Sequence, residues 1–187
     1  MRWDGLFADL EAQLAHGQWQ DTEAEAAELT RGERASITLA ERLRGVLGGE
    51  LQLQLVGGDR VQLTVSAVGE SWVGGHDHAG GLLVPLAAVQ AVDASLVVAA
   101  PDSSPGRRRL GIGSAYRVLS RVRAGVEVRG RDGQSLGEGT IDRVGHDHVD
   151  LAVHPRDESR RARSVRRWRV IPFEAVGLVR SAHASSV

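Results

Sequence analysis

Residues 84–92 (VPLAAVQAV) and residues 171–179 (IPFEAVGLV) carry one pattern, the second copy starting 87 positions after the first. Each stretch reads apolar, proline, apolar, then Ala-Val and a final apolar residue. A proline that opens a tight turn before a short strand explains both. Because short strands rich in Val and Leu also resemble one another by chance, the alternative is coincidence. The recurrence predicts that one β-rich unit occurs twice.

The residues before each stretch support this prediction. Residues 51–55 (LQLQL) and 61–65 (VQLTV) alternate apolar and polar residues on either side of the turn at 57–59 (GGD). This alternation predicts a β-hairpin with one buried face. Residues 125–153 read as a second run of strands and turns. An alignment of the copies places Leu53 opposite Val126.

The expected fold class is α+β and mainly β, with an N-terminal helical segment followed by two small five-stranded barrels, each preceded by a helix. Apolar residues at helical spacing predict helices in residues 1–33, in 36–47 with Ser36 as N-cap, and near Ser114. The predicted divisions are an acidic N-terminal helical segment (1–33), a first helix and barrel (34–98), a linker (99–110), a second helix and barrel with an arginine-rich loop (111–181) and a disordered tail (182–187).

Residues 139–151 (GTIDRVGHDHVDL) resemble the first motif of the Sm-like family, which includes the bacterial Hfq type and has an SH3-like barrel fold. Gly139, Ile141 and Val144 match the glycine and the hydrophobic residues of that motif. A PRC-like barrel would leave nearly the same traces. Gly145 stands where the family has an aspartate, so its uridine-binding residues are not carried over. The pattern is also similar to that of an actinobacterial protein group, a likeness that implies no activity.

Composition excludes several classes of activity. The chain has no cysteine and no lysine, which removes disulfides, thiolate catalysis and a Walker-type phosphate loop. No serine lies in a nucleophile elbow and no dinucleotide fingerprint is present. We therefore expect a protein without enzymatic activity and without a cofactor. No apolar run is long enough to span a membrane and no signal peptide is recognisable, so we expect a cytoplasmic protein with no membrane partner.

The strongest surface signal is residues 159–169 (SRRARSVRRWR) in the second copy. Guanidinium groups bind phosphates in a forked geometry, and an indole can stack on a base. These residues form the predicted nucleic-acid site: Arg160, Arg161, Arg163, Arg166, Arg167, Trp168 and Arg169. The alternative is a solvated arginine loop that pairs with the acidic N-terminal segment while Trp168 packs inward.

Two His-Asp-His triplets, at 76–78 and 146–148, invite a metal-site interpretation. The triplets do not align with each other in the two copies, and no third ligand is evident. We therefore expect exposed polar turns and no metal site.

Charge and repeat together leave three hypotheses for function. The leading one is a non-catalytic binding module that holds the backbone of RNA or DNA, with RNA favoured, through the arginine-rich loop. The rival is a protein–protein interaction adaptor, or a regulatory or structural protein, that acts through the acidic helix of residues 1–33, which contains eight acidic residues and two arginines. A homo-oligomer formed through sheet edges is the third.

Overall fold

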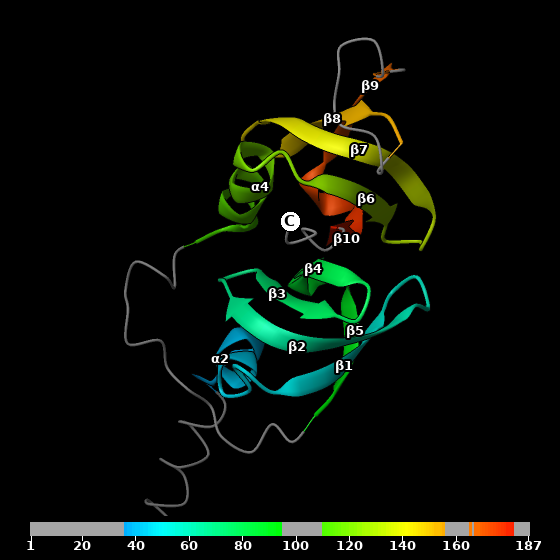
Figure 1. The fold of residues 1–187 in the computed structure, drawn as a ribbon. Coiled ribbons are helices and arrows are strands. Elements are labelled where there is room, and N and C mark those ends of the chain that lie inside the picture. The colour runs from blue at the N-terminus through cyan, green and yellow to red at the C-terminus, as the bar shows by residue number, and fades with distance from the viewer. Residues whose placement is uncertain (1–35, 95–109, 156–164, 166, 182–187) are drawn as a thin grey trace, which may run out of the picture. The chain divides into compact units, whose positions relative to one another are not determined.

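The computed structural model describes residues 36–94, 110–155, 165 and 167–181. Residues 39–187 cluster as one unit. Its ten strands form one antiparallel sheet in the order β5-β1-β2-β3-β4-β10-β6-β7-β8-β9. Among the described residues, β5 and β9 are the two edges, so the sheet is open (Figure 1).

The first half of the sheet contains five strands: β1 (Glu50–Leu55), β2 (Arg60–Val68), β3 (Trp72–Asp77), β4 (Gly80–Pro85) and β5 (Val89–Asp93). The second half contains the other five: β6 (Gly125–Gly130), β7 (Ser135–Val144), β8 (His148–Val153), β9 (Arg167–Pro172) and β10 (Val176–Ser181). Two α-helices, α2 (Leu39–Arg44) and α4 (Ile112–Arg121), precede β1 and β6 in the chain. A single 3-10 turn follows each proline-ended strand: η1 (Leu86–Ala88) and η2 (Phe173–Ala175).

The alternating pattern forms the predicted hairpin of β1 and β2. Leu51, Leu53 and Leu55 are buried on one face, and the intervening glutamines are partly exposed. The turn has Gly58 at a φ of +88°, a conformation that favours glycine. Ser114, the predicted N-cap, instead lies inside α4, which begins after Gly111.

Each half of the sheet has its own aliphatic core. Each core also contains one residue from a strand of the other half. Leu83 of β4 packs into the second core, with Tyr116 and Ile141. Leu178 of β10 packs into the first core, with Leu53. The helices also contribute, because α2 lies against β2 and β3 while α4 lies against β7.

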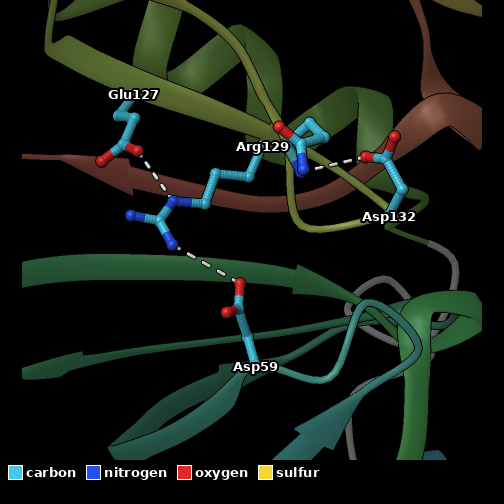
Figure 2. Close-up of polar contacts among 5 residues, drawn as sticks. Asp59, Glu127, Arg129 and Asp132 are labelled. Atoms are coloured by element: carbon cyan, nitrogen blue, oxygen red, sulfur yellow. Dashed lines mark hydrogen bonds and ion pairs between the residues drawn. The ribbon is translucent and has the colours of Figure 1, made fainter.

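The strands β4 and β10 join the two halves. Val179 lies opposite Leu83, and Ser181 lies opposite Gly81. An ion pair also links the two halves: Arg129 of β6 lies 3.5 Å from Asp59 of the β1–β2 turn. Arg129 also donates to Glu127 on its own strand at 2.7 Å (Figure 2). These carboxylates raise the pKa of the Arg129 guanidinium further, so it stays charged.

The backbones of the two halves also meet directly. A Cβ atom added to Gly57 would lie 2.5 Å from the backbone nitrogen of Gly133 and 2.7 Å from the carbonyl carbon of Asp132. Only a glycine allows the β1–β2 turn to approach the β6–β7 turn this closely. The join is therefore built from strand pairing, ion pairs and a close backbone approach.

The prediction of two closed five-stranded barrels is wrong, and the resemblance to the Sm-like, SH3-like or PRC-like families fails with it. Closing the first half would require β4 to pair with β5. The outer side of β4 is instead occupied by β10, which pairs with β6 on its other side. The strands expected to close two tandem barrels therefore connect the halves into one sheet.

The strand order is nevertheless the same in both halves, 5-1-2-3-4 and 10-6-7-8-9. The pairing corrects the sequence alignment of the first strands by two residues. Leu53 lies opposite Val92, and Val128 lies opposite Val179, so Leu53 corresponds to Val128 rather than to Val126. Later strands agree with the alignment, because Val65 and Ile141 precede equivalent register shifts.

Candidate nucleic-acid interface

The end of the arginine run lies on β9, an edge strand of the sheet. Pairing with β8 places Ile171 opposite Val149, and both are buried in the second core. Since side chains alternate along a strand, Trp168 and Val170 lie on the opposite face. They are 56% and 63% exposed, high values for large apolar side chains. The strand therefore presents an indole and an aliphatic residue at the surface.

The described arginines of β9 differ in their surroundings. Arg167 is exposed. The Arg169 guanidinium is partly buried and donates to the backbone carbonyl of Leu136 on β7. Arg167 and Trp168 thus present solvent-exposed surface, and the Arg169 guanidinium is bonded to β7.

The remaining arginines of the predicted site fall outside the described residues. Arg160, Arg161, Arg163 and Arg166 belong to the connection between Pro155, after β8, and β9. The linker arginines at 107–109 are also outside. In the sequence, these four arginines fall between the end of β8 and the start of the edge strand β9.

A buried polar pair, which no pattern in the sequence had indicated, holds the start of this connection. His154 is 2% exposed, and its Nδ1 atom lies 2.8 Å from the carbonyl oxygen of Pro155. A carbonyl oxygen only accepts, so Nδ1 carries the proton and Nε2 accepts from the Thr140 hydroxyl at 3.1 Å. The His154 amide also donates to Glu138 at 3.0 Å. The chain therefore leaves β8 from a fixed point.

The first His-Asp-His triplet borders a polar hollow in the first half, with a volume of about 650 Å³. Asp77 is committed to structure: its carboxylate accepts from Arg180 at 2.6 Å and from the amides of Ala79 and Gly80 at 2.8 and 3.0 Å. Burial raises the pKa of Asp77, but these bonds and the Arg180 charge outweigh burial and leave the pKa below its usual value. The aspartate thus closes the β3–β4 turn and joins it to β10.

The second triplet is an exposed turn. His146 precedes β8 rather than lying on it, so it does not share a strand face with His148. His148 Nδ1 lies 2.8 Å from Asp147 Oδ1, and this contact lowers the pKa of Asp147. Across the described residues, no group of three or more His, Cys, Asp or Glu side chains lies close enough to hold a metal ion.

A second, apolar hollow of about 270 Å³ lies beside the join, between α4 and strands β3, β4 and β10. Trp72 lines it, and its indole nitrogen donates to the carbonyl of Leu110 at 2.8 Å. Val118 of α4 forms part of the wall and is largely exposed. This hollow results from α4 resting on the join.

Comparison with known proteins gives no relatives: no family model matches the chain, and neither curated proteins nor solved structures match it significantly. In the described part of the chain, no helix has the length and apolar character needed to cross a bilayer.

Proposed function

We propose that this chain is a non-catalytic binding protein that holds single-stranded RNA through the arginine run and the start of β9. The observation that carries the proposal is the surface of β9, where exposed Arg167 stands beside a more than half-exposed Trp168 at the end of a run of six arginines. Guanidinium groups bind the phosphates, and the indole supplies a stacking surface for one base.

The chemistry favours a single strand over a duplex. An exposed indole on a sheet edge can stack on an unpaired base, whereas bases in a duplex present only their edges in the grooves. Arg167 directly precedes Trp168 on β9, so at least this charge lies close to the ring. Base stacking of this kind contributes about 1–3 kcal/mol and tolerates any base.

The test is binding of a fluorescent single-stranded RNA by anisotropy over a range of salt concentrations. Changing Arg160, Arg161, Arg166 and Arg167 together to Ala should weaken binding and reduce the slope of log K against log salt by about 3, because each phosphate contact contributes about 0.7. Trp168→Ala should weaken binding at all salt concentrations without changing the slope, and Trp168→Phe should restore most of it.

The matched control changes four exposed arginines elsewhere to Ala: Arg60, Arg117, Arg121 and Arg143. This variant has the same net charge as the first and should keep the wild-type salt slope. Equal losses in both variants would mean that binding follows net charge alone, and the proposed site would be wrong. The adaptor hypothesis rests on residues 1–33, which lie outside the described residues.

A further inference from the structure

In the described part of the chain, the two strands of the join, β4 and β10, have counterparts at the two edges of the sheet that pair on one side only. β5 corresponds to β10, because Val92 and Val179 take the same place opposite Leu53 and Val128. β9 corresponds to β4, because Ile171 and Val84 take the same place opposite Val149 and Val73. The strands that pair at the centre of the sheet thus recur, one at each edge.

From this correspondence we propose that the chain associates with a second copy of itself, β9 of one copy pairing with β5 of the next. The contact is head-to-tail, since two different edges meet, and it extends the sheet across copies. It goes beyond the proposed RNA binding: it uses the backbone of β9 with Val170 and Arg169, whereas the RNA test changes Trp168 and the four arginines Arg160, Arg161, Arg166 and Arg167.

The backbone of β9 is oriented for this pairing. The Phe173 amide donates to the carbonyl of Asp147 at 2.7 Å, and hydrogen bonds alternate along an antiparallel pair. The backbone groups of Ile171 and Arg169 therefore point toward β8, and those of Val170 point toward the outer edge. In β4 the Leu86 amide donates to Ser71 in the same way, at 2.8 Å, so the backbone of Leu83 points toward β10.

The difference in burial between equivalent side chains also supports a contact. Leu83 of β4 is 7% exposed because the join covers it. Its counterpart on β9 is Val170, which is 63% exposed. An exposed β-branched residue on an unprotected edge strand favours pairing with another strand.

The register of the join, transferred to the two edges, brings opposite charges together. In the join, Val179 lies opposite Leu83 and Arg180 opposite Leu82. Between copies the same register places Val92 opposite Val170 and Asp93 opposite Arg169. An aspartate and an arginine on directly opposed strand positions attract each other. Arg169 donates to Leu136 with one nitrogen, and its guanidinium has further donors for Asp93.

Sedimentation of the full chain without nucleic acid tests the proposal. We expect species heavier than the 20.0 kDa chain that increase with concentration. A heterologous contact either closes into a ring or continues, so the masses should be multiples of the chain. A single 20.0 kDa species up to about 1 mM, a Kd that corresponds to only about −4 kcal/mol of binding free energy, would overturn the proposal.

Matched variants identify the edges. Val170→Pro removes the edge-facing amide without removing a bond to β8, and should weaken association at least about tenfold. Val170→Thr keeps the amide and the side-chain shape and should associate like the wild type. On the other edge, Asp93→Arg opposes Arg169 and should weaken association more than Asp93→Asn. Far-UV circular dichroism checks folding, and Asp93→Arg tests the proposal even if Val170→Pro does not fold.

A mixing experiment tests the head-to-tail geometry. The Val170→Pro chain keeps a usable β5, and the Asp93→Arg chain keeps a usable β9, so an equimolar mixture should form a dimer that neither variant forms alone. Absence of this dimer, with both variants folded, would overturn the proposal. The variant lacking the four arginines should still associate, so failure of RNA binding and failure of self-association remain distinguishable.

Discussion

At one pair of equivalent core positions, the large side chain and the glycine lie on different strands in the two halves of the sheet. In the first half, Leu63 of β2 lies over Gly75 of β3, where an added Cβ would stand 2.8 Å from the Leu63 Cδ1 atom. In the second half the sizes are reversed, because the positions equivalent to Leu63 and Gly75 hold Gly139 and Leu151. The Leu151 side chain reaches 3.1 Å from a Cβ added at Gly137 of β7. Core volume is thus exchanged between neighbouring strands. Interiors constrain total volume, so equivalent positions can hold residues of different size.

The outer strands show a second difference. β4 and β9 share the proline that precedes a 3-10 turn, and both have an apolar residue two positions before it. That residue is buried in β4, as Leu83, and exposed in β9, as Val170. The local pattern therefore sets the strand and the turn, while the neighbour of the strand sets burial.

Gly139→Ala should lower the free energy of unfolding most, and it tests the difference in residue size between equivalent core positions of the two halves. Its counterpart in the first half is Leu63, which lies opposite Leu51 as Gly139 lies opposite Val126. A Cβ at Gly139 would stand 1.8 Å from the Ala152 carbonyl oxygen, and φ is +152°. We expect urea denaturation to show a loss of about 3 kcal/mol or more.

Gly111→Ala is the control, because an added Cβ there has no atom within 4 Å. Its free energy of unfolding should change by less than about 0.5 kcal/mol. A similarly small change for Gly139→Ala would mean that the backbones of β7 and β8 do not approach each other closely at Gly139 and Ala152.

Leu178→Ala tests whether the two halves of the sheet have separate cores. Leu178 belongs to a strand of the second half but packs in the first core. Its truncation should cost about 2–5 kcal/mol, as for buried leucines in general. Hydrogen exchange should accelerate first in β1 and β2. Val176→Ala, on the same strand but in the second core, should accelerate exchange in β6 and β7 instead. The same exchange pattern in both variants would contradict two separate cores.

Asp77 offers a smaller effect that depends on pH. Its pKa is lower in the folded chain, so its contribution to stability is present above the unfolded pKa of about 4 and is lost as pH falls through the folded value. The pair with Arg180 is largely buried, and we expect Asp77→Asn to cost about 1 kcal/mol at pH 7 and less at pH 3.

Asp147→Asn is the matched control for this effect. The pKa of Asp147 is also lowered, by His148, but its side chain is 81% exposed. An exposed pair of this kind adds little to stability. Urea denaturation at both pH values should therefore leave this variant near the wild type. An equal pH-dependent loss in both variants would show that the join does not depend on Asp77.

Local features of the fold could be predicted from the sequence. The alternation in residues 51–65 predicted the hairpin, and the prolines predicted the two turns, because period and turn chemistry act over a few residues. The partner of each outer strand could not be predicted this way. Any strand edge can pair with any other, and β4 meets β10 across almost a hundred residues. The assumption of closed barrels failed at this point.

The same limit applies to the site. The arginine run was recognisable because six charges occur close together in the sequence. The contacts that shape its surroundings join distant residues: Arg169 to Leu136, His154 to Thr140 and Arg180 to Asp77. A lone histidine before a proline, at His154, was the only local signal of the buried pair.

A substitution at Tyr116 should change the free energy of unfolding no more than Asp77→Asn does, and it compares the two helices. α2 inserts Leu43 into the first core, and α4 inserts Tyr116 into the second, its ring centroid 5.0 Å from that of Phe173. The Tyr116 hydroxyl is buried without a hydrogen-bond partner among the described residues. Since an unpaired buried hydroxyl destabilises a fold, Tyr116→Phe should raise the free energy of unfolding by about 1 kcal/mol.

Alkaline pH gives this prediction a second measurement. Burial raises the pKa of Tyr116 well above its ordinary value, so the folded chain loses stability as pH rises above about 10, where the unfolded tyrosine ionises. The chain has one tyrosine and no lysine or cysteine. In the unfolded chain, Tyr116 is therefore the only side chain that titrates between about pH 9 and 12. The stability difference between Tyr116→Phe and the wild type should therefore widen from pH 9 to pH 11. A constant difference, or a wild-type ultraviolet titration with a midpoint near 10, would mean that the hydroxyl reaches solvent and that the second core is less closed than the first.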